Sequence, residues 1–160
     1  MRIQIRTTIN GRDRELAVKP NQTLLEFLRD EFHLKGSVEG CGVGVCGSCT
    51  VLVDGRPVSS CLVLATNVEG KRVTTIEGLA QGDRLDPVQE AFLKHQAFQC
   101  GYCTPGMIMA TKALLDSNPH PTEEEIRDYL SGNLCRCGTY GEILAAIKDL
   151  SGQQAAATRK

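Results

Sequence analysis

Cysteine is the residue type in this chain with the clearest chemical implication. The 160 residues include eight cysteines in two sets: Cys41, Cys46, Cys49 and Cys61, then Cys100, Cys103, Cys135 and Cys137. The chain starts with an alternation of polar and apolar residues, which is typical of a strand and not of an export signal. We therefore expect a reducing compartment, where structural disulfides are rare. Iron–sulfur clusters and zinc remain as the two kinds of site that these thiols could form.

The first set has the Cys-x4-Cys-x2-Cys spacing, with a more distant fourth cysteine, that plant-type [2Fe–2S] ferredoxins use. Four glycines surround these ligands: Gly40, Gly42, Gly44 and Gly47. They let the backbone approach a cluster, so that N–H groups can hydrogen-bond to its sulfurs. Zinc sites favour paired Cys-x2-Cys units, which makes zinc the weaker alternative here. The loop also matches G-x-G-x-x-G, but no helix pattern follows, so dinucleotide binding is not predicted.

The second set consists of two short pairs, Cys100-x2-Cys103 and Cys135-x-Cys137. Each pair comes directly before a predicted helix. Helix N-termini stabilise negative charge, and a cluster held by thiolates carries such a charge. The four thiols therefore predict a second cluster, with a four-thiolate zinc site as the open alternative.

The first half of the chain predicts strands around one helix. The strand patterns cover residues 2–9, 15–18, 50–53, 56–60 and 73–76. Asn10-Gly11 and Asp54-Gly55 predict the turns of two hairpins. Thr23 and Glu26 fit a capping box at the start of a helix, and Gly36 is its predicted end.

The second half predicts four helices. They begin at Asp86-Pro87, at Thr104-Pro105, at Thr122 and at Thr139. Thr104 is a predicted cap, with Pro105 in the first helical position. Thr122 with Glu125 and Thr139 with Glu142 fit capping boxes. The polar tail from Ser151 is predicted to fray.

Composition and element order together predict an α+β fold class with two domains, residues 1–78 and 79–160. Hydrophobic residues make up 41%, charged residues 23%, and the net charge is −1, so no basic surface for nucleic acid is expected. No apolar run approaches the ~20 residues that cross a bilayer. Each half is small for a stable core, so a cluster in each would supply crosslinks.

Three motifs carry a family resemblance: GCGVGVCGSCTV at residues 40–51, QCGYCTPGM at 99–107 and GNLCRC at 132–137. Together they resemble the small iron–sulfur subunit of the xanthine oxidase family of molybdenum hydroxylases, and the resemblance runs from Ile3 to Leu150. It implies an N-terminal β-grasp, plant-type ferredoxin-like domain and a C-terminal all-α, four-helix-bundle-like domain. Each domain would hold one [2Fe–2S] cluster, and no residue of the chain would be catalytic.

The resemblance also implies partners and an electron route. A large subunit would carry molybdopterin cytosine dinucleotide, and a medium subunit would carry FAD, with a cytochrome as the other possible acceptor. Electrons would pass from the second cluster to the first. Gln99 and Cys137 match the positions nearest the pterin. After the last ligand the family commonly reads Cys-Thr-Gly-Tyr, whereas this chain reads Cys137-Gly-Thr-Tyr140, which resembles a branch of two-subunit enzymes that pass electrons to cytochromes.

Two other functions fit parts of the sequence. The first half could serve as a free-standing ferredoxin-like carrier, although a carrier has no need of a second cysteine set with Gln99 beside it. A zinc-stapled interaction module is the other alternative. We expect the protein in the cytoplasm, and in the periplasm only if a partner's twin-arginine signal carries the folded complex out.

Overall fold

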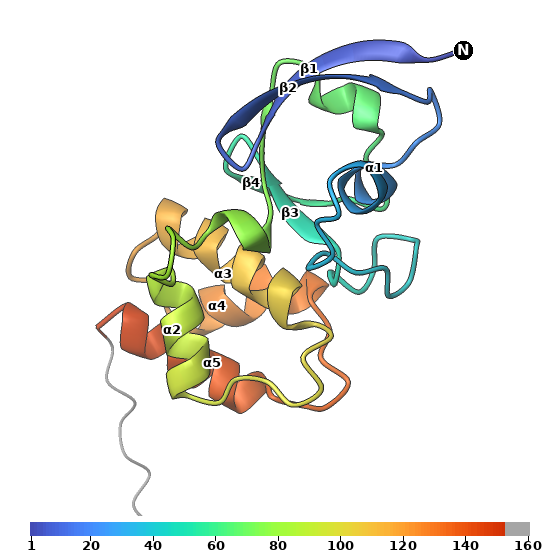
Figure 1. The fold of residues 1–160 in the computed structure, drawn as a ribbon. Helices are drawn as coiled ribbons and strands as arrows, with labels where there is room; N and C mark the ends of the chain where they lie inside the picture. Colours follow the sequence, from blue (N-terminus) through green and yellow to red (C-terminus); the bar gives the residue numbers. More distant parts are fainter. Residues whose placement is uncertain (153–160) are drawn as a thin grey trace, which may run out of the picture.

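The computed structural model describes residues 1–152 and places a β-sheet next to a group of helices (Figure 1). The predicted frayed tail falls mainly on residues 153–160, which lie outside the described residues. Among residues 1–152, no helix combines the length and the apolar character needed to cross a bilayer.

Five strands form one mixed sheet in the order β2-β1-β5-β3-β4. The strands are β1 (Ile3–Ile9), β2 (Arg12–Val18), β3 (Thr50–Val53), β4 (Arg56–Ser59) and β5 (Arg72–Thr74). β1 and β5 run parallel, and the other neighbours run antiparallel. Both predicted hairpins are confirmed, since Asn10-Gly11 and Asp54-Gly55 take the positive φ angles that tight two-residue turns require. The last strand is shorter than predicted because Ile76 begins the 3-10 helix η2 (Ile76–Gly78).

Helix α1 (Leu24–Glu31) begins as predicted and ends earlier. Thr23 Oγ1 accepts the Glu26 N–H at 3.1 Å, and the Glu26 carboxylate accepts the Thr23 N–H at 2.8 Å, so the capping box is confirmed. The predicted end at Gly36 is wrong. His33 takes a left-handed φ of 55°, and the Leu34 N–H turns back to the Leu28 carbonyl at 3.1 Å.

The second half is helical, as predicted. Its helices are α2 (Pro87–Lys94), α3 (Thr104–Ser117), α4 (Glu123–Tyr129) and α5 (Tyr140–Leu150), and the short 3-10 helices of the chain are η1 (Ala65–Val68), η2 and η3 (Leu130–Gly132). The capping box of Thr122 and Glu125 is confirmed. Two other predictions are wrong. Cys103, not Thr104, is the N-cap of α3, and Thr139 precedes α5 but its side chain does not cap the helix.

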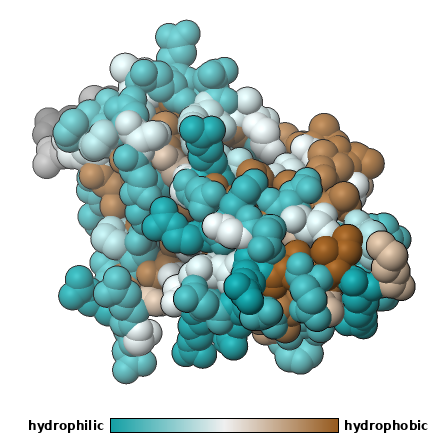
Figure 2. Space-filling model, turned by 90° about the horizontal axis from the view of Figure 1, so that it is seen from above, coloured by the Kyte–Doolittle hydropathy of each residue, from teal (hydrophilic) through white to brown (hydrophobic). Residues whose placement is uncertain are grey.

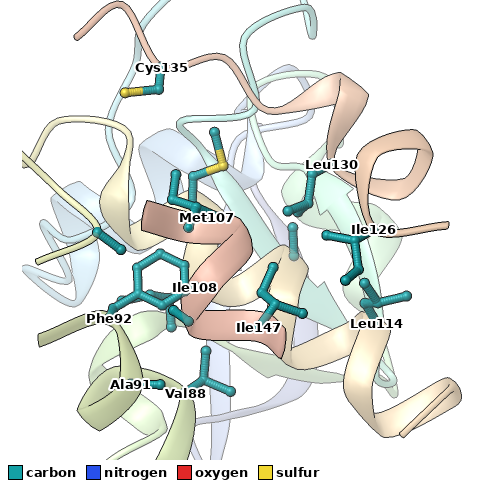
Figure 3. Packing of buried hydrophobic residues seen from close by; sticks show 14 residues of the cluster. Val88, Ala91, Phe92, Met107, Ile108, Leu114, Ile126, Leu130, Cys135 and Ile147 are labelled. Atoms are coloured by element: carbon teal, nitrogen blue, oxygen red, sulfur yellow. The ribbon is translucent and has the colours of Figure 1, made fainter. Parts of the chain in front are cut away.

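Each half has its own hydrophobic core. In the first half, Phe27 and Leu28 of α1 pack against Ile5 and Val51 of the sheet. In the second half, Phe92 of α2 and residues of α3, α4 and α5 form one cluster (Figure 3). Cys135 lies at the margin of that cluster, and its sulfur points away from the other labelled side chains (Figure 3).

The two halves also pack against each other. Leu52 of β3 contacts Met109 and Ala113 of α3 in a small buried cluster. Ile76 and Leu79, on either side of the predicted boundary, both contact this cluster and the helical core. The division at residues 78 and 79 therefore stays a prediction.

Candidate metal centres

The first cysteine set is assembled by one loop and one hairpin. Cys41, Cys46 and Cys49 lie in the loop before β3, and Cys61 follows β4. The antiparallel pairing of β3 with β4 returns the chain to this loop. There the Ser60 hydroxyl donates to the Cys49 carbonyl at 2.7 Å. Cys49 is buried, and the other three cysteines are half-buried.

Backbone donors prepare one thiol of this set for ligation. The N–H groups of Val43 and Val45 lie 3.5 and 3.3 Å from Cys41 Sγ. Hydrogen bonds from the N–H groups of Val43, Cys46 and Val45 lower the pKa of Cys41 to about 6. The thiolate is the form of cysteine that binds metals, so Cys41 is held ready for a cation.

Cys61 has the opposite shift. Burial, together with the hydrogen bond and charge of the neighbouring Cys49, raises its pKa to about 11. Cys49 therefore lies close enough to Cys61 to disfavour the charged form of its thiol. A bound metal supplies a positive charge and deprotonates its thiol ligands.

The glycines give the first loop its turns, and the contact of their own N–H groups with cluster sulfur stays a prediction. Gly42, Gly44 and Gly47 have φ angles of 66°, 75° and 70°, and a Cβ on Gly40 would lie 2.8 Å from Cys46 Sγ. The hydrogen bonds to Cys41 sulfur come from valine N–H groups between the glycines, because the glycines supply the turns that direct them.

The second set comes from two segments that precede helices. Cys100 comes shortly before α3, and Cys103 is the N-cap residue of that helix. Cys135 and Cys137 come shortly before α5. The predicted position of both pairs at helix starts is confirmed. These two segments lie on the same side of the helices as the first cysteine loop (Figure 1).

The thiols of the second set influence one another. Burial, together with the hydrogen bond and charge of Cys135, raises the pKa of Cys103 to about 12. Burial would also raise the pKa of Cys135, but the Thr139 hydroxyl and N–H, the Cys103 thiol and the Gly138 N–H lower it to about 7. The Tyr102 N–H and the Cys137 thiol lower the pKa of Cys100. The four thiols are therefore close enough to affect one another's pKa.

Each donor set offers the four thiolates that a [2Fe–2S] cluster takes. A [2Fe–2S] cluster takes its four thiolates around two irons, so its ligands need not converge on one point. A cavity of about 460 Å³ opens beside the second set, and its lining includes Cys46, Cys100, Cys103 and Cys135.

Direct hydrogen bonds join the two cysteine sites. The Leu134 N–H donates to the Cys46 carbonyl at 2.9 Å. The buried Asn133 side chain donates to the Gly47 carbonyl at 3.1 Å and to Thr50 Oγ1 at 3.3 Å. The approach is tight, since a Cβ on Gly106 would lie 2.2 Å from the Gly47 carbonyl oxygen. No local sequence pattern predicts this junction, although Asn133 and Leu134 stand inside the motif before Cys135.

Two predicted residues lie at the outer side of the second site. Gln99 and its neighbour Cys100 are exposed, and Cys137 is half-buried. The Tyr102 hydroxyl, from the same segment, donates to the Glu39 carbonyl of the first half at 2.6 Å. The contact of Gln99 and Cys137 with a partner's pterin stays a prediction.

Comparison with known families matches both halves. The family described as "2Fe-2S iron-sulfur cluster binding domain" matches residues 7–80, and the family described as "[2Fe-2S] binding domain" matches residues 75–148. The chain thus contains two [2Fe–2S]-binding domains.

Similar proteins are subunits of oxidoreductases. The chain is 47% identical to the aldehyde oxidoreductase iron–sulfur-binding subunit PaoA of Escherichia coli (strain K12), over 91% of this chain and 70% of that protein. It is 48% identical to the nicotine 6-hydroxylase small subunit of Paenarthrobacter nicotinovorans, over 95% of this chain and 92% of that protein.

The similar solved structures are also oxidoreductases. Quinoline 2-oxidoreductase from Pseudomonas putida 86 has a chain that superposes with a TM-score of 0.90 at 45% identity, over 94% of both chains. The aldehyde oxidoreductase of Desulfovibrio gigas matches with a TM-score of 0.89 at 38% identity, over 94% of this chain and 17% of that larger one. The chain therefore belongs to the small iron–sulfur electron-transfer subunits of the xanthine oxidase family of molybdenum hydroxylases.

Proposed function

We propose that this subunit takes electrons from the molybdopterin centre of a large partner at its second cysteine set and releases them from its first. Cys100, Cys103, Cys135 and Cys137 would hold the entry cluster, and Cys41, Cys46, Cys49 and Cys61 the exit cluster. When bound, each [2Fe–2S] cluster takes up one electron, which lets a two-electron oxidation feed single-electron steps. The proposal includes the finer fold expected above, a β-grasp domain followed by a four-helix-bundle-like domain.

The observation that carries this proposal is the hydrogen bond between Leu134 and Cys46. It joins the residue next to one ligand, Cys135, directly to another ligand in the other half at 2.9 Å. Asn133 and the close packing of Gly106 hold the two loops in this position. A short and rigid bonded route between the ligand sets is what transfer between two clusters needs.

Exposed apolar residues mark the two ends of the route. Hydrophilic residues cover most of the surface seen in Figure 2, and hydrophobic residues gather on its right-hand side. Around the first set, Val43, Val45 and Leu62 are 64%, 60% and 61% exposed, and Leu62 packs over Gly44. Exposed apolar clusters of this kind mark protein–protein contacts. We assign this surface to the acceptor, either FAD on a medium subunit or a cytochrome.

The other end of the route would face the large subunit. Phe98 and Tyr102, on either side of the exposed Gln99 and Cys100, are 36% and 51% exposed. Leu134, beside Cys135, is 51% exposed. Gln99 and Cys137 would then lie next to the molybdopterin cytosine dinucleotide of that partner. Substrate choice would reside in the large subunit, and the complex would act in the cytoplasm.

Replacing one ligand of the entry cluster tests whether electrons pass through the second cluster before they reach the first. In the native complex, Cys103→Ser should remove the second cluster and block turnover with the natural acceptor, while substrate still reduces the molybdenum centre. The measurement is steady-state turnover together with EPR spectra of the substrate-reduced complex. Full turnover without the second cluster would contradict the proposal. Stable isolation as a lone chain would favour the carrier, and zinc in place of iron would favour the zinc-stapled module.

A further inference from the structure

The Thr139 hydroxyl points to a cysteine sulfur and not to the helix that it precedes. Thr139 is the N-cap residue of α5 and is only 2% exposed. Its Oγ1 lies 3.1 Å from Cys135 Sγ. Its side chain makes no hydrogen bond to the first turn of α5.

Helices α1, α2 and α4 use the side chain of the N-cap residue differently. Thr23, Asp86 and Thr122 each accept helix N–H groups in complete capping boxes. An N-cap of this kind stabilises a protein by about 1 kcal/mol. The Thr139 side chain does not make this stabilising capping hydrogen bond. Its orientation is therefore set by Cys135 and not by the helix.

The turn between the two residues fixes this orientation. Gly138 has a φ of 84°, and its N–H donates to the Cys135 carbonyl at 3.3 Å. The Cys135 N–H donates in turn to the Tyr140 hydroxyl at 2.8 Å. The segment thus closes around Cys135 and leaves the Thr139 hydroxyl facing its sulfur. A chain with the commoner Cys-Thr-Gly-Tyr order has glycine at this position and no hydroxyl to offer from it.

We propose that Thr139 is a positioning residue that donates its O–H to the Cys135 thiolate and raises the reduction potential of the second cluster. This inference rests on the proposed function, because it requires a cluster at that site. A thiolate bound to iron has no proton, so the hydroxyl must be the donor. Reduction adds one electron from the upstream donor, and the proton stays on Thr139. The added negative charge strengthens the hydrogen bond, which favours the reduced form.

An EPR-monitored redox titration of the native complex tests the proposal. Thr139→Val removes the hydroxyl and keeps the shape, and it should lower the reduction equilibrium constant of the second cluster about tenfold, a shift of about 59 mV for one electron. The first cluster in the same sample should keep its potential. Thr139→Ser keeps a hydroxyl and should restore the potential of the second cluster.

Thr111→Val is the matched control. Thr111 is fully buried in α3, and among the described residues its hydroxyl has no hydrogen-bond partner. The same change there should leave both potentials in place. An unchanged potential in Thr139→Val, or an equal shift in Thr111→Val, would overturn the proposal. An absent second cluster in the unaltered complex would instead contradict the proposed function.

Thr139→Ala provides a second hydroxyl-free variant if the valine variant does not hold its cluster. A lowered potential in Thr139→Ala would support the proposal as well. Loss of the cluster in both variants, with retention in Thr139→Ser, would overturn the tuning role in favour of a role in cluster assembly.

Discussion

The two cysteine sites are built in different ways. The first places three of its four ligands in one loop, where positive-φ glycines direct backbone N–H groups to Cys41. The second collects its ligands from two segments that only the packing of the helices brings together, with the buried Cys135 at the margin of their core. The first site is therefore encoded locally, whereas the second depends on the tertiary structure of its half.

The groups that donate hydrogen bonds to cysteine sulfur also differ between the two sites. Cys41 receives hydrogen bonds from the backbone, which every residue type except proline can supply. Cys135 is influenced by the N–H groups of Thr139 and Gly138 and, in addition, by a side-chain hydroxyl, that of Thr139. Side-chain changes should therefore tune the second site more readily than the first.

The largest expected effect that tests this comparison comes from the helical core. Phe92 is 1% exposed, and Phe92→Ala should lower the free energy of unfolding by about 3–5 kcal/mol. On heating, the second cluster should be lost well before the first, because its ligands depend on this core. Visible absorption and EPR during a thermal ramp measure this order.

Phe27→Ala is the matched change in the first half, where Phe27 is fully buried. It should lower the free energy of unfolding by a similar amount. On heating, however, the first cluster should then be lost before the second. Simultaneous loss of both clusters in both variants would break the comparison and indicate that the halves unfold as one unit.

The junction between the sites should give an intermediate effect. Asn133→Ala leaves the Gly47 carbonyl and the Thr50 hydroxyl without the Asn133 amide donor, which should cost about 1–3 kcal/mol. Both clusters should assemble, but electron transfer between them should slow because the loops are no longer held together. Rapid-mixing absorption spectroscopy with substrate measures that rate. Asn67→Ala, an exposed change in η1, should leave the rate unchanged, and an unchanged rate in Asn133→Ala would mean that the amide does not position the route.

The smallest expected effect comes from the capping box of α4. Thr122→Ala should cost about 1 kcal/mol of unfolding free energy near neutral pH. The Thr122 hydroxyl also donates to the Glu125 carboxylate, and the Thr122 N–H and hydroxyl lower the pKa of Glu125. The part of the contribution that comes from this carboxylate contact is present above the unfolded-state pKa and is lost as the pH falls through the folded-state pKa. The hydrogen bond from the Glu125 N–H to Thr122 Oγ1 does not titrate, so chemical denaturation at several pH values should show the difference between the variant and the unaltered protein narrowing in acid without vanishing. Thr23→Ala, the equivalent change at α1, should leave the thermal persistence of the second cluster unchanged.

Local features of the fold followed from the sequence, and long-range ones did not. Thr23-Glu26 and Thr122-Glu125 were predictable because a capping box involves only residues three apart. The box predicted at Thr139 is wrong because Cys135, a competing partner, takes the hydroxyl. The end of α1 was misplaced because His33 adopts a left-handed conformation that is uncommon for residues other than glycine.

In the candidate site, too, the local features could be predicted from the sequence and the long-range contacts could not. Spacing and glycine content indicated the two cysteine sets, because the first has the Cys-x4-Cys-x2-Cys spacing of ferredoxins and the short pairs of the second stand before predicted helices. The contacts of Asn133 and Leu134 with Gly47 and Cys46 carry no local pattern, because they join residues far apart in the sequence. Only the packing of α3 on β3 reveals them.

The most direct test of the central claim is a metal and spin count on the native complex, purified without chelators and reduced by substrate. The account predicts about four irons and about four acid-labile sulfides per copy of this chain, two distinct [2Fe–2S] EPR signals, and molybdenum in a large partner. Zinc in place of iron, or a single two-iron signal, would contradict it.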